Sequence, residues 1–169
     1  GGWFAGMAEG LPGKNVDLRI AQFGASEQKR LEAARNMISG KIRNSRTLMR
    51  RNSRTEAERI GNQLKELAIQ ATKAASPGQL LGIGGTAARL YFASFPAMIG
   101  DNTRIDVSDF HENGRSRRPP PDPLNALLSF CYALLVKDLT VALASVGFDP
   151  YLGMFHKPRF GRPALALDL

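Results

Sequence analysis

Apolar residues recur three and four positions apart along most of this 169-residue chain, and that spacing is typical of one face of an α-helix. Between residues 26 and 54 the recurring residues are Leu31, Ala34, Met37, Ile38 and Ile42. Between residues 56 and 73 they are Ile60, Leu64, Leu67, Ala68 and Ala71. No convincing strand pattern follows residue 14. The spacing therefore predicts an all-α fold, a domain built of several helices.

Capping residues divide this pattern into separate helices. Asn15 can cap a helix that carries Val16, Ile20 and Phe23, and Ser26 opens the next one. Residues 76–78 read Ser-Pro-Gly, which ends one helix and begins another. Residues 100–122 are polar and then Pro-rich, and they predict one long irregular loop.

The most apolar helix is predicted over residues 124–146. It is apolar nearly all round, with Lys137 and Asp138 in its middle. Charged residues in that place argue against a membrane span and for a helix in the protein core. Cys131 lies on this helix and is expected to be packed in the core rather than reactive.

Residues 1–14 alternate bulky and small side chains and break at a Gly-Leu-Pro-Gly turn, so they predict one short strand. A single strand has nothing to pair with in this sequence and needs a sheet from elsewhere. The first residues have neither the basic nor the long apolar region of a signal peptide, and no initiator Met is present. We expect a fragment of a longer protein.

The chain carries 23 Lys and Arg residues against 15 Asp and Glu, a formal charge of +8. Such an excess suits a polyanion, with nucleic acid as the first choice and an acidic membrane surface as the second. The single cysteine excludes an internal disulfide framework and a cysteine zinc site. This cysteine usage is compatible with a reducing, cytoplasmic location.

A basic stretch, residues 41–54, contains no acidic residue. Arginine predominates there, and the guanidinium group matches phosphate oxygens with two parallel hydrogen bonds. The stretch therefore favours phosphate contact, and hence nucleic acid. An ordinary solvated helix face is the alternative.

The glycine-rich run at residues 82–87 resembles a dinucleotide-binding loop only superficially. That loop follows a strand in a βαβ unit, whereas this run is flanked by helical sequence, so we reject a nucleotide site. A helix start or a close crossing of two helices is the alternative. No Asp or Glu occurs between Glu66 and Asp101, so the segment offers no carboxylate for a metal.

His156 lies in a Gly- and Pro-rich connector, with Lys157, Arg159 and Arg162 after it and Asp168 twelve residues on. An imidazole with carboxylates can hold Mg²⁺ or Mn²⁺ beside a phosphate, while the cations clamp the nucleic-acid strand. One His and one Asp do not make a site by spacing alone. The alternative is a histidine whose hydrogen bonds are satisfied by the following helix.

Several segments together resemble one family, the integrase called CRISPR-associated protein one, which inserts new spacers into CRISPR arrays. The resembling segments occur in the family's order and span nearly the whole chain: residues 15–19 (NVDLR) with 21–23 (AQF), 41–46 (KIRNSR), 81–92 (LGIGGTAARLYF), 117–130 (RRPPPDPLNALLSF), and 153–159 (GMFHKPR) with 161–162 (GR) and 165–169 (LALDL). Their joint occurrence makes the resemblance specific.

The resemblance implies an N-terminal β domain joined to an all-helical catalytic domain. Residues 1–14 would then be a remnant strand and linker, and residues 15–169 a C-terminally truncated catalytic domain. Members of the family form homodimers bridged by a ferredoxin-fold partner, CRISPR-associated protein two, and act in antiviral defence. They catalyse a metal-dependent attack of a prespacer 3′-hydroxyl on the DNA of the CRISPR repeat, and often have nuclease (hydrolase) activity. No membrane partner is implied.

The family holds its Mg²⁺ or Mn²⁺ with a Glu, a His and an Asp. His156 and Asp168 match two of these positions, but Gly84 stands where the family has Glu, and a further acidic position lies beyond Leu169. One imidazole and one carboxylate supply too few oxygen ligands for a tight site. We therefore expect strand transfer to be absent or strongly reduced in this chain.

Two hypotheses follow from the resemblance. The first is a metal-dependent integrase and endonuclease fragment with His156 and Asp168 as catalytic metal ligands. The second is a non-catalytic DNA-binding or assembly module. The first hypothesis places Arg43, Arg46, Arg159 and Arg162 on phosphates. The full set of candidate DNA-binding residues is Lys41, Arg43, Arg46, Arg50, Arg51, Arg115, Arg117, Arg118, Lys157, Arg159 and Arg162.

Overall fold

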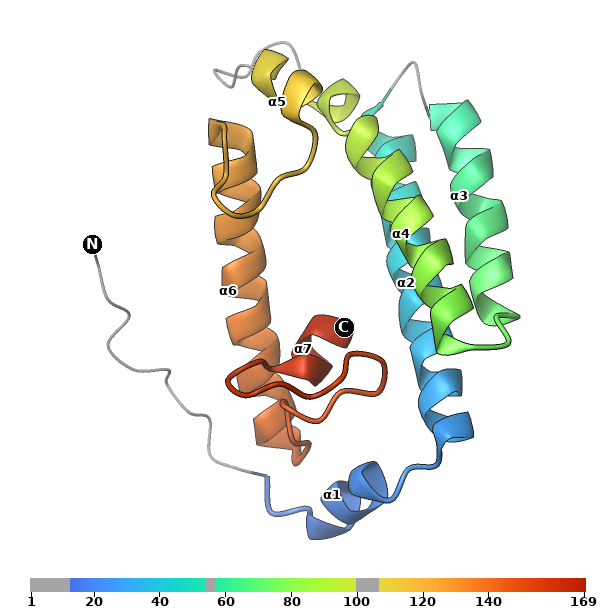
Figure 1. Ribbon diagram of the computed structural model, residues 1–169, viewed down its shortest axis with the longest axis vertical. Coiled ribbons are helices and arrows are strands. Elements are labelled where there is room, and N and C mark those ends of the chain that lie inside the picture. Colours follow the sequence, from blue (N-terminus) through green and yellow to red (C-terminus); the bar gives the residue numbers. More distant parts are fainter. Residues whose placement is uncertain (1–12, 54–56, 100–106) are drawn as a thin grey trace, which may run out of the picture. The chain divides into compact units, whose positions relative to one another are not determined.

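The computed structural model describes residues 13–53, 57–99 and 107–169, and it contains no β-strand within these ranges (Figure 1). Its elements are α1 (Val16–Phe23), α2 (Glu27–Asn52), α3 (Ala57–Thr72), α4 (Pro77–Ala93), the short 3-10 helix η1 (Pro96–Met98), α5 (Ser108–Asn113), α6 (Pro123–Val146) and α7 (Ala164–Asp168). The prediction of an all-α fold is confirmed. The strand predicted in residues 1–14 lies outside the described residues, apart from the last two.

The chain divides into two compact units. One comprises residues 1–34 and 132–169, and therefore contains α1, the C-terminal part of α6, the connector after it and α7. The other comprises residues 35–131, with most of α2 and all of α3, α4 and α5.

The predicted capping residues act as expected. The Asn15 side chain accepts a hydrogen bond from the Leu18 amide at 3.0 Å, and Ser76 accepts one from the Gln79 amide at 3.2 Å. Pro77 follows at the first position of α4, where a missing N–H costs nothing because no carbonyl of the helix would receive it. The helix boundaries near residues 15, 26 and 76 therefore follow from local chemistry.

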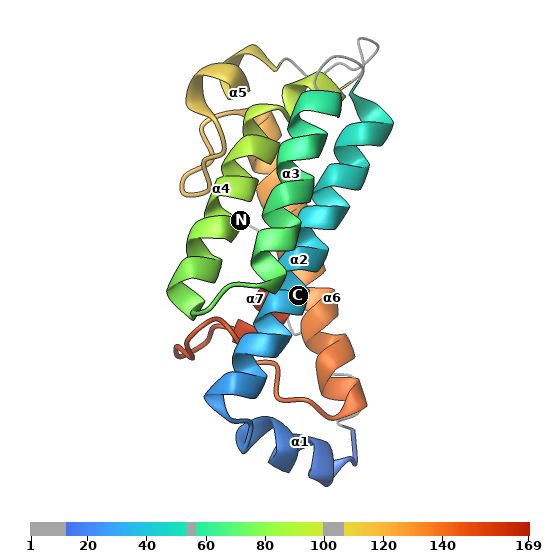
Figure 2. The same ribbon diagram turned by 90° about the vertical axis from the view of Figure 1, so that its right-hand side faces the viewer.

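The core of the unit 35–131 lies between α2, α3 and α4, which run side by side in Figures 1 and 2. Of the apolar residues predicted from the sequence, Ile42, Ile60, Leu64, Ala68 and Ala71 are buried in it. Met49, Leu80 and Ile83, which were not predicted, are buried as well. Two side chains fasten the helices by bonding to backbone carbonyls. The Ser39 hydroxyl donates to the Ala68 carbonyl at 3.1 Å, and Arg35 donates to that of Ala74 at 2.7 Å.

The glycine-rich run lies inside α4 rather than at its start, and this placement supports the rejection of a dinucleotide loop. A Cβ atom added at Gly84 would meet Ile38 of α2 at 3.5 Å, an ordinary van der Waals distance. One added at Gly85 would meet nothing within 4 Å. The helix crossing does not require glycine at either position.

The first part of the loop predicted over residues 100–122, up to residue 106, lies outside the described residues, and α5 forms in the part that is described. Phe110 of α5 is 2% exposed, and its ring lies 6.0 Å from that of Phe95, centroid to centroid. Burial of this one aromatic ring explains why a six-residue helix forms in a polar stretch. The sequence pattern was too short to reveal it.

A fully buried amide, Asn125, organises the segment that leads into α6. Its side-chain nitrogen donates to the Gly114 carbonyl and to Asp122 Oδ2, and its oxygen accepts from Arg115 and from the Ser116 amide, at 2.7–2.9 Å. Every polar group of the amide is therefore paired, as burial demands. The network holds residues 114–116 against the start of α6.

In the unit with both chain ends, a glutamine rather than an apolar residue anchors α1. Gln22 is 3% exposed; it donates to the Asp149 and Leu152 carbonyls and accepts from the Asp149 amide. The apolar residues Val16, Ile20 and Phe23 are instead 61–76% exposed. The described residues leave the apolar side of α1 uncovered.

The prediction that α6 is a core helix is wrong for the described residues. Only 11% of its apolar window is buried, and Cys131, expected to be packed, is exposed. By length and composition alone α6 is apolar enough to cross a membrane, although Lys137 and Asp138 form an exposed ion pair of 2.7 Å in its middle. The error arose because composition measures how apolar a helix is and not how much of it has a partner.

The Asn125 network yields a test of stability. Asn125→Ala would leave Asp122 Oδ2 and the Gly114 carbonyl without their donor, while Asp122 Oδ1 keeps its bond from the backbone amide of residue 125, so we expect the free energy of unfolding to fall by ~2–4 kcal/mol. Urea denaturation followed by circular dichroism measures the change. Asn62→Ala, an exposed position on α3, is the control and should change stability by less than ~0.5 kcal/mol. Equal stability of the two variants would contradict the assigned role.

Candidate functional site

The last helix carries the polar centre of the unit that contains both chain ends. α7 is fixed to the connector after α6 by a hydrogen bond from the Leu165 amide to the Pro150 carbonyl at 2.9 Å. Its first three residues, Ala164, Leu165 and Ala166, are buried, and Asp168 at its end is 1% exposed. Burial of small apolar residues therefore places one carboxylate inside the protein.

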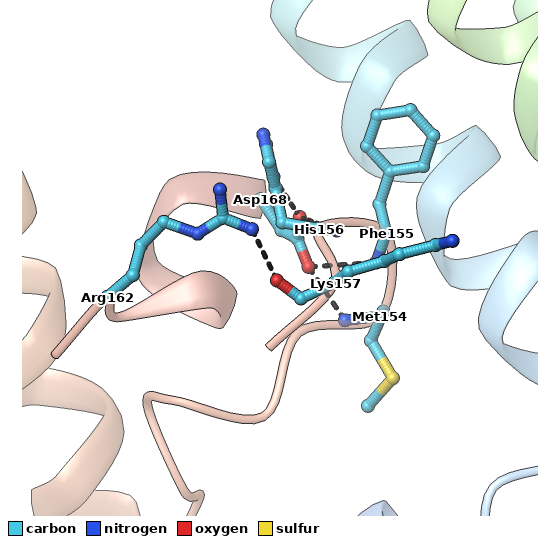
Figure 3. A network of polar contacts seen from close by, with 6 residues as sticks. All are labelled: Met154, Phe155, His156, Lys157, Arg162 and Asp168. Carbon is cyan, nitrogen blue, oxygen red and sulfur yellow. Dashed lines mark hydrogen bonds and ion pairs between the residues drawn. The ribbon is translucent and has the colours of Figure 1, made fainter. Parts of the chain in front are cut away.

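The Asp168 carboxylate accepts four hydrogen bonds, which compensate for its burial (Figure 3). Oδ2 accepts from the amides of Met154 at 2.7 Å and Phe155 at 3.0 Å. Oδ1 accepts from the His156 amide at 2.9 Å and lies 2.6 Å from His156 Nδ1. Asp168 therefore holds three successive residues of the connector as well as the histidine ring.

Gly153 permits this arrangement because the backbone is packed closely around it. A Cβ atom at this position would lie 2.5 Å from the His156 carbonyl oxygen and 3.0 Å from Asp168 Oδ2. Contacts of that length with backbone and with a buried carboxylate cannot be accommodated without a shift. A residue that lacks a side chain is thus required beside the carboxylate.

The geometry fixes the orientation of the His156 ring. Because the carboxylate already accepts backbone N–H groups, the proton between the two side chains resides on Nδ1, which makes Nε2 the acceptor of the neutral ring. The side chain is 38% exposed, and Phe155 packs edge-on against it at 5.6 Å between centroids. Within the described residues no other side-chain hydrogen bond engages the ring, so Nε2 remains available.

These residues do not fit a complete magnesium or manganese site. Both oxygens of Asp168 are occupied by N–H donors, and Gly84, which has no side-chain ligand atom, belongs to the other compact unit, on α4. In the part of the chain that the structure describes, no three His, Cys, Asp or Glu residues lie close enough together to hold a metal ion. The centre provides one available nitrogen and no free carboxylate.

Three cations follow His156 in the same connector, and they differ in exposure. Lys157 and Arg159 are exposed, whereas Arg162 is half-buried and donates to the Lys157 carbonyl. Figure 3 shows this bond beside the Asp168 network. The sequence showed only that these basic residues follow the histidine. The structure adds that two of them, Lys157 and Arg162, are bonded to each other in the same connector.

The basic stretch on α2 is distributed over the helix surface. Arg43, Arg50 and Arg51 are exposed, Lys41 is half-buried, and Arg46 is half-buried with a hydrogen bond of 3.0 Å to the Gly61 carbonyl. Arg46 and Arg50 line a small cleft together with Glu58 of α3. The stretch is free of acids in sequence, but the fold brings a carboxylate beside it.

The three arginines predicted in the loop before α6 have different environments. Arg115 is half-buried, bonds to Ser116, Asn125 and Ser129, and lies over the Phe92 ring at 5.8 Å. Arg117 and Arg118 are exposed. Internal bonds thus engage Arg115, and its neighbours stay open to solvent.

Two residues that sequence reasoning did not single out prove to organise the described structure. Gln22 ties α1 to the connector, and Asn125 ties the preceding loop to α6. Each lay within a segment quoted for its family resemblance, but a polar residue in a helix gives no sign that it will be buried. Gly153 was likewise part of a quoted segment, with no signal for its close contacts.

A protein-family model described as "CRISPR associated protein Cas1" matches residues 1–169 of the chain. The chain is 46% identical over 174 residues to a CRISPR-associated exonuclease Cas4/endonuclease Cas1 fusion of Rhodospirillum rubrum, which covers 100% of this chain and 30% of that protein. It is 42% identical over 171 residues to CRISPR-associated endonuclease Cas1 3 of Thermus thermophilus, with 100% of this chain and 48% of that protein covered. The chain thus spans less than half the length of both relatives.

Two solved structures resemble the fold. A partial Cas6-RT-Cas1–Cas2 complex matches with a TM-score of 0.75 and 29% identity, over 91% of this chain and 46% of the other. A Cas1 protein from Thermotoga maritima matches with a TM-score of 0.74 and 24% identity, over 99% of this chain and 50% of the other. The second likeness concerns the helical fold alone.

The Asp168 network predicts the behaviour of the connector. Asp168→Asn replaces one acceptor oxygen by an NH₂ group that would face N–H donors, so we expect amide exchange at Met154, Phe155 and His156 to accelerate about 100-fold, for a loss of ~3 kcal/mol in a buried network. Hydrogen–deuterium exchange with mass spectrometry measures this. Asp149→Asn is the control because the carboxylate of Asp149 accepts a single exposed bond, from the Tyr151 amide. Unchanged protection in Asp168→Asn would refute the assignment.

Proposed function

Because this chain belongs to the Cas1 family of CRISPR-associated proteins, we propose that it is the helical part of a DNA integrase and endonuclease that inserts spacers into CRISPR arrays. The two relatives compared carry endonuclease in their names. One observation carries the proposal: the His156 ring is held by Asp168 through Nδ1, with Nε2 available and exposed cations beside it in the chain.

The proposed reaction is the attack of a prespacer 3′-hydroxyl on a phosphodiester of the CRISPR repeat. In this proposal Lys157 and Arg159 bind phosphate oxygens of the DNA, and His156 presents Nε2 to the reacting region. Asp168 is a positioning residue that fixes the ring and the backbone of the connector. It acts through the histidine and not on the substrate.

We propose that Mg²⁺ or Mn²⁺ assists this chemistry and that the chain as given is impaired in it. Both ions prefer several oxygen ligands, and these residues provide none that is free. Gly84 replaces the acid that the family resemblance implies at that position.

The proposed partners are prespacer and repeat DNA, a second copy of this chain, and Cas2. A structure with similar fold and 29% identity is a complex of a Cas1-containing fusion with Cas2, which supports the last of these. A cytoplasmic location is proposed with them, since the DNA substrate and the single thiol suit that compartment.

A non-catalytic DNA-binding or assembly module is the second candidate. The occupied Asp168 carboxylate and the missing acid at Gly84 favour it, because both reduce the ligands available for a metal. The two candidates differ in strand transfer and agree in DNA binding. Metal binding and DNA affinity therefore have to be measured in separate experiments.

The position of Gly84 gives the first test. Gly84→Glu should raise the affinity for Mn²⁺, measured by titration with electron paramagnetic resonance detection, by about tenfold or more because it adds an oxygen ligand. The Cβ is accommodated against Ile38 at 3.5 Å, and glutamate is a better helix former than glycine by ~0.5 kcal/mol, so the fold should persist. Gly85→Glu is the matched control, since it adds the same acid one residue along the same helix, where there is open space. Equal gains in both variants would argue against a site at residue 84.

The exposed arginines of α2 give the second test. Replacing Arg43 by Ala should lower the slope of log affinity for duplex DNA against log salt concentration by about 0.9, the value for one lost phosphate contact. Arg→Ala preserves helix propensity, so folding is not the variable. Lys65→Ala on α3, also exposed, is the control. A salt slope unchanged in the Arg43 variant would remove this arginine from the interface.

A further inference from the structure

A tight turn three residues after His156 presents one aromatic ring to solvent. Arg159 and Arg162 pair as an isolated bridge, and the Arg162 amide donates to the Arg159 carbonyl at 3.0 Å. Gly161 has φ +68, a left-handed conformation that glycine adopts without strain. The turn therefore leaves Phe160 at its tip. Its side chain is fully exposed (109%), the highest value among the exposed large apolar residues of the described chain.

The fold does not require phenylalanine at this position. A fully exposed ring contributes no burial to the core, and the turn is closed by backbone bonds and by Gly161. Arg162 braces the turn by donating to the Lys157 carbonyl (Figure 3). The ring is thus displayed by a braced turn, and the described contacts give no structural reason for it.

The chemistry around the tip is cationic. Lys157, Arg159 and Arg162 stand within three residues of Phe160, and residues 150–167 contain no Asp or Glu. The one carboxylate nearby in sequence, Asp168, is buried and occupied. An aromatic ring among cations, without any acid, matches a partner that offers flat rings and negative charge together.

We propose that Phe160 is a base-stacking tip that receives an unpaired nucleobase of DNA, while Lys157 and Arg159 contact the flanking phosphates. Stacking on an aromatic side chain is tolerant of sequence, because every base has a flat face. The tip is four residues from His156 in the chain, so a stacked base would be held near the candidate site. The inference rests on the proposed DNA function and adds to it a specific contact with an unpaired base.

A protein partner fits the same surface less well. The centres of protein interfaces are poor in lysine and rich in contiguous apolar groups. Here the neighbours of the ring in the turn are arginine, glycine and arginine, with proline and lysine before them. A single ring with such neighbours offers little apolar area to a protein, but it suits a flat base that is flanked by negatively charged phosphates.

The direct test places a fluorescent ring at the tip. Trp3 is the only tryptophan, so the double variant Trp3→Phe, Phe160→Trp reports on residue 160 alone. We expect its emission to be quenched when a forked duplex with unpaired 3′ ends binds, and to remain unquenched with the same fork carrying abasic sites in its single-stranded arms. Emission that does not change on binding of the intact fork would overturn the proposal.

Affinity measurements separate stacking from general apolarity. Phe160→Ala should weaken binding of the fork about tenfold (~1.4 kcal/mol) and leave its salt slope unchanged, because a stacking contact releases no counterions. Phe160→Leu, apolar but without a flat ring, should bind as weakly as the alanine variant, and Phe160→Trp should retain full affinity. Phe130→Ala, an exposed ring on α6, is the matched control and should bind like the unmodified chain. Leucine that binds as well as phenylalanine would overturn the stacking assignment.

Remaining outcomes separate this inference from the proposed function. A chain that binds no DNA at any salt concentration refutes both, whereas salt-dependent binding without quenching at residue 160 refutes the stacking tip alone. Loss of self-association in Phe160→Ala, measured by analytical ultracentrifugation, with fork affinity unchanged, would assign the ring to a protein interface and also overturn the inference.

Discussion

The buried carboxylate of Asp168 is the interaction on which the candidate site depends. A carboxylate removed from water is costly unless its oxygens are paired, and here three backbone amides and one imidazole pair them. The same bonds fold the connector around Gly153 and orient His156. Position and tautomer of the histidine are therefore consequences of satisfying one buried charge.

These bonds favour a different role for Asp168 from the one that the family resemblance implies. Family resemblance implies a metal ligand at Asp168, yet an oxygen that already accepts two N–H groups has little left to offer a cation. Histidine held by a carboxylate through Nδ1 is the usual arrangement around metal ligands, in which the carboxylate belongs to the outer layer. The oxygen ligands of any ion would then have to be groups other than Asp168.

The sequence predicted what is local and missed what depends on distant partners. The period of the apolar residues and the caps at Asn15 and Ser76 are properties of neighbours in the chain, so the helices followed from them. Burial of Gln22 and Asn125 depends on partners far away in the sequence or across a loop. The pattern of residues within a helix does not indicate those partners. For the site, sequence indicated which residues belong together along the chain but not that Asp168 would use both oxygens internally. Apolar composition likewise overstated the burial of α6.

The basic residues behind the formal charge of +8 fall into two groups, those bonded within the fold and those open to solvent. Arg19 donates to the carbonyls of Gly13 and Gly147, and Arg115 is held by Asn125, so both guanidinium groups already satisfy the chain's own acceptors. A guanidinium whose N–H groups already bond to the chain's own carbonyl or amide oxygens must give up those bonds to meet a phosphate, so it gains little from the exchange. Exposed cations such as Arg159 have no such commitment and can exchange water for a phosphate oxygen. The cations that can meet the proposed DNA partner are thus the exposed ones without internal bonds, and not all those counted in the total charge. A cation's location and bonds in the fold therefore decide its function more than its presence in the sequence.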